Sequence, residues 1–201
     1  MTGDHYFSTE PAVDTHRRQV TFAVDGREYA LTASSGVFSA ARLDPGTAVL
    51  LRKAALPGSA TSGALLDLGC GYGPIACVLA SRAPAATVWA VDVNARAREL
   101  TSENAARLGL ADRIRVSAPD DVPDDVSFAE LWSNPPIRVG KAELHEMLGR
   151  WLPRLTPDGV AWLVVARHLG GDSLQRWLDE AGWRVERHAS QKGYRVFRVT
   201  H

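Results

Sequence analysis

From residue 64 onward, short apolar runs alternate with longer segments that have helical spacing. We expect strands at 64–68, 87–91, 113–117, 128–133, 160–166, 183–188 and 194–199. We expect helices at 75–82, 95–108, 142–151 and 172–181. Strands that are separated by helix-length segments predict a mainly parallel sheet with helices on both faces. The last two runs leave no room for a helix between them, so they should pair antiparallel.

The first 56 residues follow a different pattern and are expected to form an extension of the domain at 57–201. Two apolar-leaning runs, Val20–Val24 and Arg27–Leu31, flank the dipeptide Asp25-Gly26. Asp-Gly between two such runs is a strong signal of a β-hairpin, because both residues tolerate positive φ. Asp44-Pro45-Gly46-Thr47 then opens a short helix that should end near residue 55.

The charge balance and the cysteine count argue against a globally basic nucleic-acid-binding protein, a disulfide-rich protein and a zinc protein. The chain has 23 Lys and Arg residues and 23 Asp and Glu residues, so a nucleic-acid partner would need a local basic patch. Cys70 and Cys77 form neither a disulfide framework nor a zinc pattern, and no metal site is expected. The acidic start and the lack of a membrane-length apolar run favour a cytoplasmic protein.

A glycine-rich turn follows the first strand of the alternating region. It reads Asp67-Leu68-Gly69-Cys70-Gly71-Tyr72-Gly73, and a helix comes next. Dinucleotide sites use G-x-G-x-x-G, whereas Pro74 stands here where their third glycine would be. Asp67 would also repel a phosphate. The turn therefore suits a ligand with a cationic group better than it suits a dinucleotide.

The second strand of this region ends at Asp92, where a carboxylate can accept hydrogen bonds from both hydroxyls of a ribose. The turn and Asp92 together predict a site for a nucleoside with a cationic tail, and S-adenosylmethionine meets that description. The alternative is a tight turn between strand and helix with no ligand. Asp67 at the start of the turn and Asp92 at the end of the next strand favour the interpretation as a binding site.

These motifs, with Asn134-Pro135-Pro136 after the fourth strand, resemble the class I S-adenosylmethionine-dependent methyltransferases. More narrowly, the chain is similar to the "methyltransferase small" family, which includes the ribosomal RNA guanine-N2 methyltransferases. The narrower resemblance extends to Ile137-Arg138, Gly140-Lys141, His5–Ser8, Ser35–Ser39 and Lys192–Val196.

The resemblance implies a Rossmann-like, doubly wound α/β fold, with a seven-stranded sheet whose last strand is antiparallel. It implies that Gly69, Gly71 and Gly73 line the cofactor and that Asp67 lies near its amino-acid end. Asp92 would hold the ribose hydroxyls, and Asp120 would face the adenine amine. The chain departs from the family pattern in having one domain, Ala129 in place of an acid, and Ile137 in place of a base-stacking aromatic residue.

Asn134-Pro135-Pro136 can act as a rigid clamp for an amine. The lone pair of an exocyclic amine is delocalised into the base, so the enzyme must localise it. The Asn134 side-chain oxygen and the Pro135 carbonyl can each accept one amine hydrogen and aim the lone pair at the methyl group. The prolines keep these acceptors fixed. Asn134 is expected to border the cofactor as well.

The clamp predicts methylation of an exocyclic amine, with guanine N2 in ribosomal RNA as the leading hypothesis and RNA as the partner. Phe38, Ile137, Arg138 and Lys141 are the candidate substrate-binding residues, and a monomer is expected. Arginines in the last twenty residues could supply a local basic patch or could simply face solvent. Alternatives are methylation of adenine or of a protein glutamine, a non-catalytic subunit that holds the cofactor, and a nicotinamide dehydrogenase.

Overall fold

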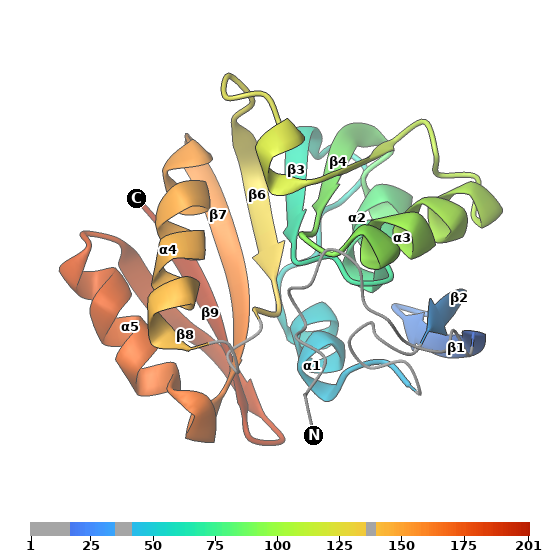
Figure 1. Ribbon diagram of the computed structural model, residues 1–201. Helices are drawn as coiled ribbons and strands as arrows, with labels where there is room; N and C mark the ends of the chain where they lie inside the picture. Colours follow the sequence, from blue (N-terminus) through green and yellow to red (C-terminus); the bar gives the residue numbers. More distant parts are fainter. Residues whose placement is uncertain (1–16, 35–41, 136–139) are drawn as a thin grey trace, which may run out of the picture.

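The computed structural model describes residues 17–34, 42–135 and 140–201 of the chain (Figure 1). A seven-stranded sheet runs through the molecule in the order β5-β4-β3-β6-β7-β9-β8. Its strands are β3 (Ser62–Leu68), β4 (Ala85–Val91), β5 (Ile114–Ser117), β6 (Phe128–Ser133), β7 (Leu155–Ala166), β8 (Arg184–Gln191) and β9 (Tyr194–Thr200). The sheet therefore has the number of strands that the family resemblance implied.

Five helices are described together with the sheet. They are α1 (Pro45–Lys53), α2 (Pro74–Arg82), α3 (Ala95–Arg107), α4 (Lys141–Trp151) and α5 (Gly171–Glu180). Single 3-10 turns also occur at Pro119–Asp121, Leu152–Arg154 and Arg167–Leu169. Within the described ranges, no helix is both long enough and apolar enough to cross a lipid bilayer.

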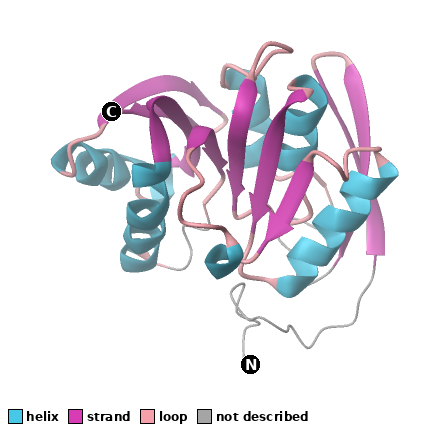
Figure 2. Cartoon of the chain, turned by 90° about the horizontal axis from the view of Figure 1, so that it is seen from above, coloured by secondary structure: helices cyan, strands magenta, loops and turns pink. Residues whose placement is uncertain are grey.

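Side chains alternate along the strands and build one apolar core on each face of the sheet. Leu65 on β3 and Trp132 on β6 pack with the core under α1, α2 and α3, whereas Leu66 and Leu131 pack with the core under α4 and α5. Helices lie on both sides of the sheet when it is seen from above (Figure 2). This arrangement confirms the predicted doubly wound α/β fold.

The strand directions also match the prediction. β3 is parallel to β4 and β6, and the outer pairs β4–β5 and β6–β7 are parallel too. β9 is antiparallel to both of its neighbours, β7 and β8. A two-residue turn with positive φ at Lys192 (50°) and Gly193 (81°) joins β8 to β9. Such a turn matches the twist of antiparallel strands, so β9 folds back between β7 and β8.

Two strands of the main sheet extend at least three residues beyond the expected bounds. β7 begins at Leu155 rather than at residue 160, because Leu155 already pairs with Phe128 and the turn-like residues after it form an irregularity within the strand. Gly159 lies in this irregularity, where an added Cβ would come within 3.0 Å of the Phe128 carbonyl oxygen. β8 continues to Gln191 because its last residues still pair with β9.

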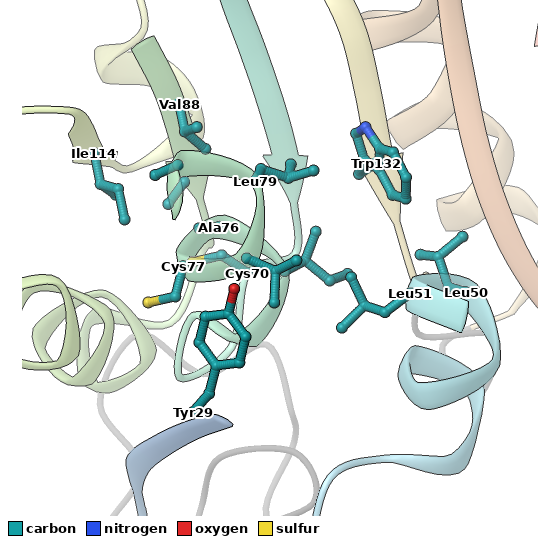
Figure 3. Packing of buried hydrophobic residues seen from close by; sticks show 14 of the residues in the cluster. Tyr29, Leu50, Leu51, Cys70, Ala76, Cys77, Leu79, Val88, Ile114 and Trp132 are labelled. Atoms are coloured by element: carbon teal, nitrogen blue, oxygen red, sulfur yellow. The ribbon is translucent and has the colours of Figure 1, made fainter. Parts of the chain in front are cut away.

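The expected N-terminal hairpin is present as β1 (Arg17–Val24) and β2 (Arg27–Ser34). Asp25 and Gly26 form its turn with φ values of 45° and 77°, as the Asp-Gly signal predicted. Figure 3 shows Tyr29 of the hairpin and Leu51 of α1 in one cluster with Trp132 of the sheet. The division of the chain at residue 57 stays a prediction. Residues from both sides of this boundary pack in one hydrophobic core.

Asn104 of α3 fastens the hairpin to the domain. Its Oδ1 accepts the Thr32 backbone N–H at 2.8 Å, and its Nδ2 donates to the Thr32 carbonyl at 2.9 Å. The same Nδ2 donates to the Tyr72 carbonyl at 2.8 Å. Asn104 is fully buried, so these three bonds satisfy groups that water does not reach easily.

Replacing this amide should therefore destabilise the fold. We expect Asn104→Ala to lower the free energy of unfolding by roughly 2–4 kcal/mol, because it leaves buried backbone groups without partners. Urea denaturation measures the change. Ser102→Ala, on the exposed side of the same helix, is the matched control and should change stability by less than about 0.5 kcal/mol. An equal effect of both substitutions would contradict this role of Asn104.

Candidate functional site

The carboxyl ends of three adjacent strands bring the predicted site residues to one edge of the sheet. β3 leads into the glycine loop at 69–73, β4 leads into Asp92, and β6 leads into Asn134. β3 lies between β4 and β6, and all three strands run in the same direction. Ligands of open α/β sheets bind at such an edge.

The glycine loop is held in a turn by backbone bonds to the end of β4. The N–H groups of Gly69 and Cys70 both donate to the Val91 carbonyl, at 2.8 and 3.0 Å. Gly69 has a φ of 76°, which favours glycine, and a Cβ placed on it would meet no atom within 4 Å. The backbone beside Gly69 is therefore open to a close approach by a ligand.

Helix α3 supports the same loop with two side chains that sequence reasoning missed. Thr101 Oγ1 donates to the Gly71 carbonyl at 2.9 Å, and Asn104 reaches the Tyr72 carbonyl. A Cβ on Gly73 would lie 2.9 Å from Thr101 Cγ2, so glycine permits this close contact. The available signal was a pair of polar residues, three positions apart, on the apolar face of a predicted helix.

Asp92 closes the loop through both of its carboxylate oxygens. Oδ2 accepts the Gly71 N–H and Oδ1 accepts the Asn94 N–H, both at 2.9 Å. Burial raises the pKa of Asp92, and these two backbone hydrogen bonds oppose that rise. An ionised carboxylate has about four acceptor positions, so capacity remains for ligand hydroxyls.

Asp67 is a fully buried acid whose carboxylate is only partly satisfied. Its Oδ2 accepts the Ala76 N–H at the start of α2, at 2.8 Å. Its Oδ1 is buried and has no hydrogen-bond partner within the described part of the chain. Burial is the main cause that raises the Asp67 pKa to about 8, and the charge of Asp92 adds to the rise. A cationic group nearby would favour the ionised form of this acid.

These features fit a nucleoside that carries a cationic tail. The free oxygen of Asp67 suits an ammonium group, Asp92 retains acceptor capacity for a ribose, and the space beside Gly69 admits the ligand backbone. The two cysteines of the region are buried, and burial raises the pKa of both thiols. A raised pKa disfavours the reactive thiolate, and both cysteines pack in the hydrophobic core.

Asn134 comes directly after β6 and is bonded to the start of α1. Its Nδ2 donates to Asp44 Oδ1 at 2.6 Å and to Thr47 Oγ1 at 3.0 Å. Within the described ranges, no group donates to Asn134 Oδ1. Pro135 follows and is buried. Ser133 donates to the Leu68 carbonyl at 2.7 Å, which ties the end of β6 to the end of β3 beside the glycine loop.

The remaining predicted residues have different placements. Pro136, Ile137, Arg138 and Phe38 lie outside the described residues. Lys141 is the exposed first residue of α4. The side chain of Asp120 is 87% exposed and pairs with Arg150 at 2.7 Å. A contact between Asp120 and adenine therefore stays a prediction and would compete with this ion pair.

The C-terminal arginines are partly neutralised by acids. Arg187 and Arg195 both bind the carboxylate of Asp172, and Arg198 lies 4.0 Å from Glu186. These ion pairs lower the net charge of the basic patch that the sequence suggested. The strands β8 and β9 therefore provide a weaker positive field than their arginine count implies.

The raised pKa of Asp67 predicts a pH-dependent stability. The folded-state pKa of about 8 lies above the ordinary value of 3.8, so the folded protein holds an extra proton between these limits. Stability should fall as pH rises through this window, by up to about 1.4 kcal/mol per pH unit. Asp67→Asn should remove most of this dependence and should stabilise the ligand-free protein at pH 8.

Urea unfolding of the ligand-free protein at pH 5, 6, 7 and 8 measures this effect. The exposed Asp158, at the opposite end of the sheet, provides a matched Asp158→Asn control that should retain the wild-type slope. Asp92 contributes in the same direction because its pKa is raised too, so a smaller slope should persist in Asp67→Asn. An unchanged slope in Asp67→Asn would show that this acid is ionised in the folded protein.

The family model of the methyltransferase small domain matches residues 28–198. YbxB of Bacillus subtilis is 33% identical over 199 residues, which cover 98% of each chain. The ribosomal RNA small subunit methyltransferase C of Aeromonas hydrophila is 44% identical over 133 residues, which cover 65% of this chain and 36% of that protein.

A solved structure shares the fold over nearly the whole chain. It is the T. thermophilus 16S rRNA N2 G1207 methyltransferase (RsmC) in complex with AdoMet and guanosine. The TM-score is 0.73 at 24% identity, and the match covers 95% of this chain and 52% of that one. This chain thus spans between a third and about half of these two named methyltransferases. The family model and the full-length similarity to YbxB confirm the resemblance found in the sequence: this chain belongs to the methyltransferase small-domain family.

Proposed function

We propose that this methyltransferase transfers a methyl group from S-adenosylmethionine to an exocyclic amine of a nucleobase, with N2 of guanine in ribosomal RNA as the substrate. The observation that carries the proposal is the position of Asn134. It follows the strand next to the glycine loop, and its amide nitrogen is bonded to α1. Its side-chain oxygen is thereby available to an amine beside the cofactor site.

The cofactor would be held by groups from β3 and β4. Gly69, Gly71 and Gly73 give the backbone a close approach, and Asp92 has acceptor capacity for the ribose hydroxyls. The buried oxygen of Asp67 would pair with the ammonium group of the methionine part. Asp120 remains the proposed partner of the adenine amine. The bound cofactor supplies an activated methyl group on a sulfonium.

The acceptor amine would be held by Asn134 and Pro135. The Asn134 Oδ1 and the Pro135 carbonyl each accept one amine hydrogen, which localises the nitrogen lone pair and directs it toward the donor. This is a positioning and electrostatic effect, and it requires that both oxygens stay fixed. Proline at position 136 removes a backbone donor and restrains the residue before it. Asn134, Pro135 and Pro136 are therefore the proposed catalytic residues.

The choice of RNA as substrate is supported by the named relatives. The Aeromonas protein is named a ribosomal RNA methyltransferase, and the Thermus structure contains guanosine. This chain matches only 36% and 52% of these two proteins. That it shares their activity on ribosomal RNA is therefore part of the proposal. Phe38, Ile137, Arg138 and Lys141 are the proposed substrate contacts. A monomeric state and a cytoplasmic location stay predictions from the sequence.

A methyl-transfer assay tests this function. Purified protein and tritiated S-adenosylmethionine are incubated with ribosomal RNA, with ribosomal subunits and with a release-factor protein, and labelled nucleosides are then identified. We expect label in RNA as N2-methylguanosine. Label in adenosine would show that adenine, and not guanine, is the methylated base. Label only in protein would show that a glutamine side chain, and not RNA, is the substrate. Cofactor binding without transfer to any acceptor would favour a non-catalytic subunit.

Two substitutions should separate the roles of the site residues. Asn134→Ala should lower kcat by roughly a hundredfold and leave the Kd for S-adenosylmethionine within about twofold of wild type, because it removes an acceptor for the amine. Asp92→Asn should raise that Kd by about tenfold or more, because it removes the charge that faces the ribose. Calorimetry and steady-state kinetics measure both values.

The reverse pattern would refute this division of roles. If Asn134→Ala abolished cofactor binding, Asn134 would belong to the cofactor site rather than to the amine clamp. Circular dichroism and urea unfolding of each variant should accompany the kinetics, since Asp92 also holds the Gly71 N–H.

A further inference from the structure

We propose that Asp44 is a positioning residue that fixes the orientation of the Asn134 amide and so makes Asn134 Oδ1 the acceptor for the substrate amine. The inference rests on the proposed function. Asp44 lies ninety positions before Asn134, in the N-terminal part of the chain, and precedes the first residue of α1.

The carboxylate of Asp44 decides which end of the amide faces it. An asparagine side chain can be turned by half a rotation, which exchanges its oxygen and its nitrogen. An ionised carboxylate only accepts hydrogen bonds, so the atom of Asn134 that lies 2.6 Å from Asp44 Oδ1 has to be Nδ2. Hydrogen bonds to a charged acceptor are stronger than neutral ones, and this short contact is of that kind. The opposite orientation would bring two oxygens together.

Thr47 strengthens the same orientation. Its Oγ1 lies 3.0 Å from Asn134 Nδ2 and accepts the second amide hydrogen. Both hydrogens of the amide are then occupied by α1, and Oδ1 is the end that can face a substrate. Thr47 is buried, so solvent competes little for this contact.

Further contacts hold the start of α1 in place. Asp44 Oδ1 also accepts the Thr47 backbone N–H at 3.0 Å and thereby caps the helix. Gly46 lies in the same cluster, where a Cβ would approach Asp44 Oδ1 to 2.9 Å, Tyr194 Cε1 to 3.0 Å and Asn134 Nδ2 to 3.2 Å. The absence of a side chain at Gly46 lets the helix terminus approach the end of β6 this closely.

The competing explanation is that Asp44 only caps helix α1. The substitution Asp44→Ser separates this capping role from the orientation of the Asn134 amide. Serine caps a helix about as well as aspartate, but its shorter side chain does not reach Asn134. Asp44→Asn is the conservative rescue variant, since it retains an oxygen that can accept from both Thr47 and Asn134. Asp112→Ser, an exposed acid near the start of β5 at the opposite end of the sheet, is the matched control.

We expect Asp44→Ser to lower kcat at least tenfold, with the Kd for S-adenosylmethionine and the urea midpoint close to wild type. Asp44→Asn should recover most of the lost rate, and the control should retain full activity. A purely capping role would leave kcat of Asp44→Ser unchanged as long as the midpoint is unchanged. That result would overturn the inference.

A spectroscopic measurement tests the inference without any methyl transfer. In ¹⁵N-labelled protein, the side-chain NH₂ of Asn134, assigned through its loss in Asn134→Ala, should give two well-separated, slowly exchanging proton signals. Asp44→Ser should shift these signals and speed their exchange, whereas Asp112→Ser should leave them unchanged. If wild-type protein transfers no methyl group, the proposed function fails, and these signals still decide the orientation. Signals unaffected by Asp44→Ser would refute it.

Discussion

The parallel register of β3 with β4 and β6 is the constraint on which the site depends. Leu68 is level with Val91 on one side, and Asp67 is level with Trp132 on the other. The next residues along each strand are therefore the glycine loop, Asp92 and Ser133-Asn134, which meet at one edge. Hydrogen bonds lock this arrangement, from Gly69 N–H to Val91 and from Ser133 to the Leu68 carbonyl. A slip of one residue between β3 and β4 would displace Asp92 from the glycine loop, and a slip between β3 and β6 would displace Asn134 from it.

The same edge holds two buried acids that cost the fold stability. Asp67 and Asp92 are both raised in pKa by burial, and they repel one another. Backbone N–H groups of the loop and of α2 satisfy three of their four oxygens and leave Asp67 Oδ1 without a partner in the described part of the chain. A core that served stability alone would hold apolar residues at these positions. In the proposed cofactor site, this unsatisfied carboxylate oxygen would pair with the cationic group of the ligand, so local stability would be given up for binding.

Local patterns in the sequence were sufficient to predict the strands, the helices and the position of the glycine loop between β3 and α2. Hydrophobic periodicity, the glycines after a strand and Asp25-Gly26 each act over a few residues, and the family resemblance added the strand count. Contacts between distant segments carry no such signal. The bonds from Asp44 to Asn134, from Asn104 to Thr32 and from Arg150 to Asp120 join residues that lie 30 to 90 positions apart. They depend on how helices pack on the finished sheet, so periodicity does not reveal them.

The contact between α1 and Asn134 brings the N-terminal segment to the proposed site. α1 packs on β7 and β9, and Gly46 lies against Tyr194 at the start of β9. Asp44 is thus held by a helix that is itself held by the sheet, and a group on such an element keeps its position better than one on a free loop. In the proposed mechanism this precision matters, because a rotated Asn134 amide would present a donor where the substrate amine needs an acceptor. The proposed clamp after β6 would accordingly depend on the segment before the glycine loop as well as on its own prolines.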